Sequence, residues 1–90
     1  MATVNQYAGY ARALMTQKRN DKSLEILKAA KTKFGDVFAV NNAMAFAYSS
    51  KADFKKALEY AEKALTQAPE PQKAAISGNI AKLKEGKDIN

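Results

Sequence analysis

Apolar side chains recur every three or four residues along the first third of the chain, which is the spacing of one face of an α-helix. Gly35 follows this region, and glycine readily takes the left-handed conformation found just after a helix C-terminus. The pattern therefore predicts two amphipathic helices within residues 4–35, separated by the polar stretch 17–21. Their apolar stripes are Val4, Tyr7, Ala11 and Leu14, and then Leu24, Leu27, Ala30 and Phe34.

The same spacing continues to residue 83 and predicts three further helices, followed by a tail at 87–90. Asp36 and Asp53 are expected to cap the third and fourth helices, because an aspartate side chain accepts hydrogen bonds from the unpaired amides at a helix start. Pro69 closes the fourth helix, and Pro71 suits the first turn of the fifth, which Gly86 ends. The residues expected in the core of these helices include Met44, Tyr48, Leu58 and Leu65.

A shift of 34 residues aligns the first pair of expected helices with the second pair. Polar and apolar residues both match, and the helix-ending Gly35 falls on Pro69. Shared polar residues and shared helix breakers favour an internal repeat over two unrelated helical segments. The identical positions are Ala11 with Ala45, Ala13 with Ala47, Lys22 with Lys56, Leu24 with Leu58, Glu25 with Glu59, Ala30 with Ala64, and Thr32 with Thr66.

Thirty-four residues is the period of the tetratricopeptide repeat, and residues 38–69 resemble that repeat. The positions that fit are Met44, Ala45, Tyr48, Phe54, Ala57, Ala64, Leu65 and Pro69. Residues 4–35 fit at fewer positions, namely Tyr7, Tyr10, Ala11, Leu14 and Ala30. The departures from the family pattern are Asn20 and Asn41 in place of large aromatic residues, Ser23 in place of alanine and Gly35 in place of proline.

This resemblance implies an all-α fold of five helices in a single domain, residues 1–90. Two antiparallel helix pairs, at about 4–35 and 38–69, would stack as a short right-handed α-solenoid, and a capping helix would follow at about 71–86. The segment 80–90 also resembles the C-terminus of larger bacterial proteins that finish in such helix pairs.

The start of the chain, Met1-Ala-Thr-Val, lacks the basic and apolar blocks of a secretory signal. As written, the sequence therefore indicates a cytoplasmic protein. A periplasmic or secreted location stays open if these residues are part of a longer protein. No apolar run approaches the roughly 18 residues of a membrane-spanning helix.

The residue types argue against catalysis. The chain has no cysteine and no histidine, which removes thiolate chemistry, disulfides and the commonest metal ligand and general base. Glu59 and Glu62 share a helix face, but no third ligand accompanies them, and the four glycines are too isolated to form a phosphate loop. We therefore expect no enzyme activity, no cofactor and no metal site.

The net charge of +6 is compatible with acidic partners, although a solvated and solubilising surface explains it as well. Much of the charge, including Lys28, Lys31 and Lys33, is expected on the second and fourth helices. Only two arginines are present, and the tyrosines are mostly expected in the core. Nucleic-acid recognition would need a continuous basic stripe with exposed aromatic residues, so polyanion binding ranks third among the possible functions.

In the tetratricopeptide family the first helix of each pair lines a concave groove that holds a segment of a partner protein. The residues that this layout places in the groove, and that we expect to bind a partner, are Asn5, Arg12, Asn42, Phe46, Ser49 and Lys73. Arg12 can grip a carboxylate with two parallel hydrogen bonds, so an acidic or C-terminal peptide is the expected partner class. The lysine and asparagine set of the family's carboxylate clamp is missing, because Ala8 and Ala43 stand in its place. The alternative function is a structural or homodimerising domain of a larger bacterial protein.

Overall fold

The computed structural model describes residues 3–90, and within that range it contains five α-helices and no strand. The all-α prediction is confirmed, as is the number of helices. Met1 and Ala2, on which the prediction about the start of the chain partly rests, lie outside the described residues. The helices are α1 (Val4–Thr16), α2 (Asn20–Phe34), α3 (Phe38–Ser50), α4 (Phe54–Gln67) and α5 (Glu70–Lys84).

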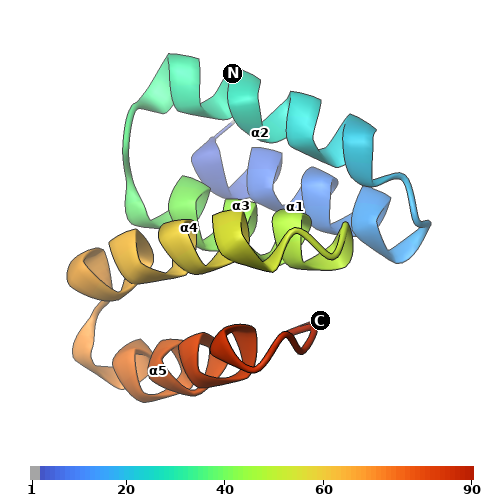
Figure 1. Ribbon diagram of the computed structural model, residues 1–90. Helices are drawn as coiled ribbons and strands as arrows, with labels where there is room; N and C mark the ends of the chain where they lie inside the picture. The colour runs from blue at the N-terminus through green and yellow to red at the C-terminus, as the bar shows by residue number, and fades with distance from the viewer. Residues whose placement is uncertain (1–2) are drawn as a thin grey trace.

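Each helix turns back along the one before it, so that the chain runs to and fro through the molecule (Figure 1). Helix α1 packs against α2 and also against α3, its counterpart in the predicted second repeat. Helix α3 in turn packs on α4, and α5 lies against α4 at the other end of the molecule (Figure 1). The described residues fill an elongated volume of 36 × 28 × 18 Å.

The turns inside the two helix pairs have the same backbone geometry, 34 residues apart. Lys18 in the first turn and Ala52 in the second each have a φ of 63°, a left-handed conformation that residues with a side chain seldom adopt. In both turns the next backbone N–H donates to the carbonyl five residues earlier at 2.9 Å. Matching turns are what an internal repeat predicts, whereas the tetratricopeptide assignment and the handedness of the stack stay predictions.

Most of the expected helix ends are found where the sequence placed them. Gly35 has a φ of 86° and closes α2, Asp53 accepts a hydrogen bond from the Lys56 amide at 3.3 Å, and Pro71 lies in the first turn of α5. The prediction for Asp36 was wrong, because Val37 occupies the N-cap of α3 without a side-chain hydrogen bond. The Asp36 carboxylate instead accepts a hydrogen bond from the side chain of Asn41, at 2.7 Å.

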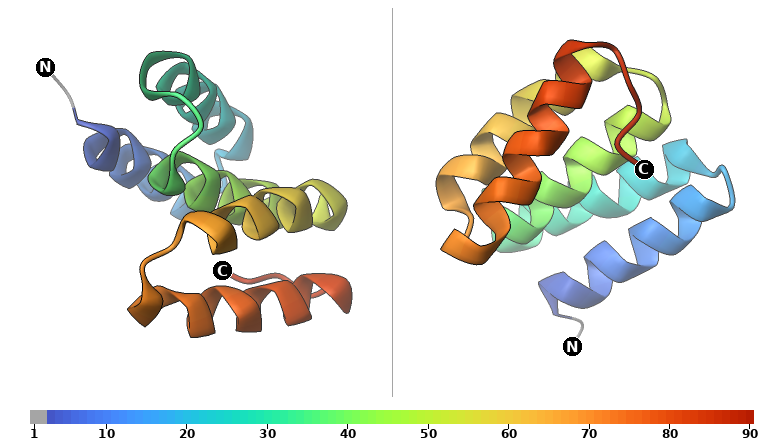
Figure 2. Two further views of the ribbon diagram at one scale, coloured as in Figure 1. Left: turned by 90° about the vertical axis from the view of Figure 1, so that its left-hand side faces the viewer. Right: turned by 90° about the horizontal axis from the view of Figure 1, so that it is seen from below.

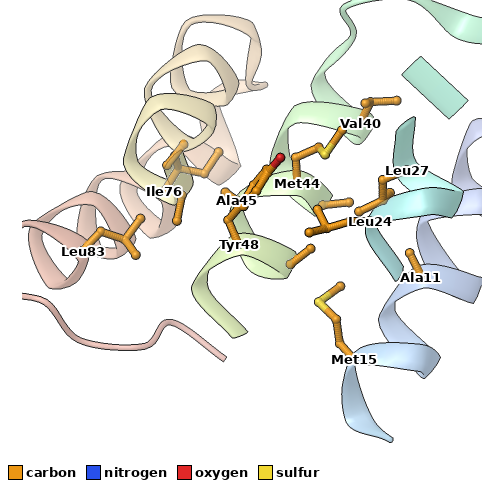
Figure 3. Close-up of a cluster of buried hydrophobic side chains, with 14 of the residues drawn as sticks. Ala11, Met15, Leu24, Leu27, Val40, Met44, Ala45, Tyr48, Ile76 and Leu83 are labelled. Carbon is orange, nitrogen blue, oxygen red and sulfur yellow. The ribbon is translucent and has the colours of Figure 1, made fainter. Parts of the chain in front are cut away.

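The core lies between the helix layers and is built around large aliphatic side chains from α2 and α3 (Figure 3). Met44 and Tyr48 are buried as predicted, and Tyr48 stacks on Tyr60 of α4 with the ring centroids 5.5 Å apart. Alanines occupy the positions where helices approach closely, so the backbones can pack without a gap. The fully buried residues of this kind include Ala11, Ala30, Ala47, Ala57 and Ala64.

The prediction that Leu58 and Leu65 are buried was wrong, because both are only partly covered by the core cluster. The buried face of α4 is formed by Ala57, Ala61 and Ala64. Leu58 and Leu65 each follow one of these alanines and are therefore turned by about 100° around the helix. They lie at the edge of the interface and shield the alanine face from water.

Polar residues stand at two positions of α2 where the tetratricopeptide pattern has apolar ones, and both form hydrogen bonds. The fully buried Ser23 donates from Oγ to the carbonyl of Ala11 in α1, at 2.9 Å. Asn20, at the start of α2, exchanges hydrogen bonds with Ser50 at the end of α3, at 3.3 and 2.7 Å. Each pair joins two helices, because a buried polar group without a partner would destabilise the fold.

Asn41, the third departure, is fully buried near the start of α3. Its Nδ2 donates to Asp36 Oδ1 at 2.7 Å and to Gln67 Oε1 at 2.8 Å, and Gln67 Nε2 donates to the Asp36 carbonyl. These bonds tie the α2–α3 turn to the end of α4. A polar network therefore occupies the position where the tetratricopeptide pattern would have an aromatic side chain.

Candidate partner-binding face

Arg12 of α1 lies against Phe46 of α3, a partly buried residue that also packs on the core cluster. The guanidinium carbon of Arg12 lies 4.2 Å from the centre of the Phe46 ring. Such a contact is attractive because a delocalised cation interacts with the electron-rich face of an aromatic ring. Arg12 is exposed, and it forms no ion pair with any carboxylate of residues 3–90. Its planar group is thus held in place while its N–H donors remain available.

A hollow of about 230 Å³ lies beside Arg12, between the first halves of α1 and α3. Its lining includes four small residues, and Asn5 and Asn42 contribute amide groups. Within the described part of the chain, neither of these amides makes a side-chain hydrogen bond. We call this the amide hollow; its lining is Asn5, Ala8, Gly9, Arg12, Phe38, Ala39, Asn42 and Ala43.

A second hollow, of about 350 Å³, lies on the other side of Arg12 toward the end of α3. The residues that line it come from α1 and the turn after it, from the end of α3 and from the tail of the chain. Two of them, Arg12 and Lys18, are cationic, and neither is ion-paired within residues 3–90. We call this the tail hollow; its lining is Arg12, Met15, Thr16, Lys18, Ser50, Asp88 and Asn90.

Residues 87–90, the tail, turn back from the end of α5 toward α3 (Figure 2). Gly86 permits this reversal, because its φ of 72° is readily adopted only by glycine. Ser49 Oγ donates to Asp88 Oδ1 at 2.6 Å and accepts from the Ile89 amide at 3.0 Å. The Asn90 side chain donates to the carbonyl of Phe46 at 2.9 Å. The tail is therefore bound across the end of the face that the sequence analysis assigned to a partner.

The ionisation of Asp88 reflects this docking. Partial desolvation alone would raise the pKa of Asp88, but hydrogen bonds from Ser49, Asn90 and the Ile89 amide outweigh it. The pKa of Asp88 therefore lies below its ordinary value of 3.8. Of these hydrogen bonds, the one from Ser49 exists only when the tail is docked, and because it stabilises the ionised form, the charged carboxylate favours the docked tail.

The structure brings together four of the six residues predicted to bind a partner. Asn5, Arg12 and Asn42 line the amide hollow, and Phe46 supports Arg12. Ser49 is buried, and its hydroxyl is already bonded to the tail, at 2.6 and 3.0 Å. Lys73 lies on α5, where it pairs with Glu70 at 3.2 Å, and it lines neither hollow.

Sequence reasoning missed the part that Asp88, Ile89 and Asn90 play in this face. These residues follow a helix end and were expected only to form a tail, with its contacts left open. One signal was available: Ile89 is an apolar residue between two polar ones, three positions after Gly86, and in the structure it packs on the core. Their contacts with α3 join residues about forty positions apart, which no local pattern reveals.

Among residues 3–90 no three acidic side chains come close enough together to hold a metal ion. None of the five helices has the length and apolar character needed to cross a membrane. Comparisons with protein-family models, with curated proteins and with solved structures gave no match.

Proposed function

We propose that this chain is a non-catalytic interaction module of the tetratricopeptide type, which binds a segment of another protein along the exposed side of α1 and α3. We call this surface, formed by Asn5, Arg12, Asn42 and Phe46, the binding face. The observation that supports the proposal most is Arg12, which lies on Phe46 between two hollows and has no ion-pair partner within residues 3–90. The matching turns at Lys18 and Ala52 support the repeat assignment.

The chemistry of the binding face favours an acidic, extended segment. Arg12 can hold a carboxylate through two parallel hydrogen bonds, and the free amides of Asn5 and Asn42 can bond to a peptide backbone. Phe46 adds a flat apolar contact, and arginine and aromatic residues often carry most of the energy of an interface. The helices hold these groups in position before binding, so little conformational entropy is lost on their side.

A homodimer is the second candidate, and Tyr10 is the observation that favours it. This side chain on α1 is 57% exposed, the largest exposure of a large apolar or aromatic residue in the described part of the chain. It lines neither hollow, so a dimer through Tyr10 would use another surface. Sedimentation equilibrium distinguishes the two: a dimer that Tyr10→Ser dissociates supports this candidate, and a monomer at all concentrations removes it.

The proposed function is tested by capturing partners from the source cell with three forms of the chain. The first is unaltered, the second carries Arg12→Ala and Phe46→Ala, and the third carries alanine at Lys28, Lys31 and Lys33 of α2. A partner of the binding face is retained by the first and third forms and lost by the second. The contact is partly exposed, so retention should also fall as the salt concentration rises.

The same experiment can contradict the proposal. If the partner stays bound to the Arg12→Ala, Phe46→Ala form but is lost from the lysine variant, the functional surface lies on α2 and α4. Lys31 and Lys63 lie 5.5 and 5.3 Å from the ring of Tyr60 there, as part of a basic surface that would suit a polyanion. Thermal unfolding of all three forms controls for loss of structure, since none of the substituted residues is fully buried.

A further inference from the structure

The contacts of the tail resemble those of a bound peptide more than those of a helix end. Two of its three anchors, the Asp88 carboxylate and the Asn90 amide, are side chains, and the third is the backbone N–H of Ile89. Ile89 also places its side chain against the core cluster. An acidic residue, an apolar residue and an amide therefore each occupy a distinct position on α3.

Ser49 is the centre of this arrangement. Its hydroxyl donates to Asp88 and accepts from the Ile89 amide, so both of its hydrogen-bonding roles are used while the residue is 2% exposed. A polar group at such a position is costly to leave without partners. Anything that replaces the tail must therefore supply an acceptor and a backbone N–H in the same arrangement.

The surroundings of the tail favour additional negative charge. Arg12 and Lys18 line the tail hollow together with Asp88, and neither is ion-paired within the described residues. The hollow beside the tail has a volume of about 350 Å³, which leaves room for side chains that the tail itself does not provide. A longer acidic segment could contact both cations and continue past Arg12 into the amide hollow.

We propose that the Phe46 end of the binding face, together with the adjoining Ser49, recognises an extended segment in which an aspartate is followed by an apolar residue and then by an amide side chain, and that this segment enters by displacing the chain's own tail. The inference rests on the proposed function and specifies the chemistry of its partner. The tail is the internal competitor, because it already satisfies the same groups on α3.

Competition within one chain has a measurable consequence. A covalently attached tail acts at an effective concentration of roughly millimolar, so only the fraction of molecules whose tail is undocked can bind an external segment, and the apparent affinity falls in proportion to that fraction. Releasing the tail without disturbing the helices should therefore raise the affinity for an external segment. Substitutions at Asp88 and Ile89 achieve this, because both residues lie beyond the end of α5.

The test uses a fluorescent peptide with the sequence of residues 85–90 and follows its anisotropy on titration with the 90-residue chain. The Asp88→Ala, Ile89→Ala chain should bind this peptide at least about tenfold more tightly than the unaltered chain, since its own tail no longer competes. Adding Ser49→Ala to the released chain should remove most of that gain. A matched peptide with alanine in place of aspartate should bind to none of the chains.

The proposal is overturned if the released chain does not bind the peptide, or if it binds the alanine peptide equally well. Circular dichroism of each variant shows whether the five helices are intact, so loss of fold cannot imitate either result. If the peptide does not bind while partner capture still depends on Arg12 and Phe46, only the proposed order of aspartate, apolar residue and amide side chain (the recognition rule) is wrong. If the peptide binds but capture does not depend on those residues, the recognition rule stands and the proposed function falls.

Discussion

At the scale of single residues, the left-handed backbone conformation of Ala52 should lower the free energy of unfolding because residue 52 carries a Cβ atom. A Cβ atom in this conformation costs about 1 kcal/mol or more, and glycine avoids that cost. Ala52→Gly should therefore leave the free energy of unfolding unchanged or raise it by up to about 1 kcal/mol, despite the greater freedom of glycine in the unfolded chain. Urea denaturation measures the change.

Ala29 provides the matched control for this prediction. It is exposed like Ala52, but it lies inside α2, where replacing alanine by glycine lowers helix stability by about 1 kcal/mol. The two substitutions are chemically identical, but their effects on the free energy of unfolding should have opposite signs or differ by about 1–2 kcal/mol. Equal destabilisation by both would show that the α3–α4 turn does not have the geometry described.

Asp88 makes the docking of the tail dependent on pH. Its pKa is lower in the docked tail than the ordinary 3.8, so the charged carboxylate stabilises docking at all pH values well above 3.8. That contribution is lost as the pH falls below 3.8 and through the lowered pKa. The NMR signal of the Ile89 amide should therefore move toward its undocked position on acidification. In the Asp88→Asn chain the shift should not change over the same range.

At the scale of helices, the close approach of α2 to its neighbours depends on small residues. Ala30 is fully buried, and a larger side chain there would push the helices apart. Ala30→Leu should lower the free energy of unfolding by about 1–3 kcal/mol. Ala29→Leu, at the next and exposed position, should change it by less than about 0.5 kcal/mol. Thermal melts of the two variants that coincide would place α2 in a different orientation.

The helices themselves were largely predictable, because their periodicity and their ends depend on nearby residues. Gly35, Asp53 and Pro71 act on the backbone within one turn, and all three predictions hold. Asp36 does not cap α3 because its carboxylate accepts a hydrogen bond from the side chain of Asn41. The same Asn41 side chain also donates to Gln67, which lies on another helix. The prediction that Leu58 is buried failed for a similar reason, since only packing decides which side of α4 meets α3.

At the scale of the whole molecule, the sequence predicted the four residues of the binding face but not the tail that docks beside them. Asn5, Arg12 and Asn42 share a hollow because helical spacing puts them opposite the core stripes of α1 and α3. The contact between Arg12 and Phe46 needs the two helices to lie side by side, and only the repeat indicated that they would. The docked tail was missed, since its contacts span about forty residues and follow a glycine turn.

The most direct test of the binding face is to map, by NMR, which backbone amides shift when the 85–90 peptide is added to the Asp88→Ala, Ile89→Ala chain. The account predicts that the largest shifts cluster on α1 and α3, around Arg12, Phe46 and Ser49. Amides of α2 and α4 near Lys31 and Lys63 should move little. Shifts centred on those outer helices, or no shifts at any helix, would contradict the assignment of the binding face.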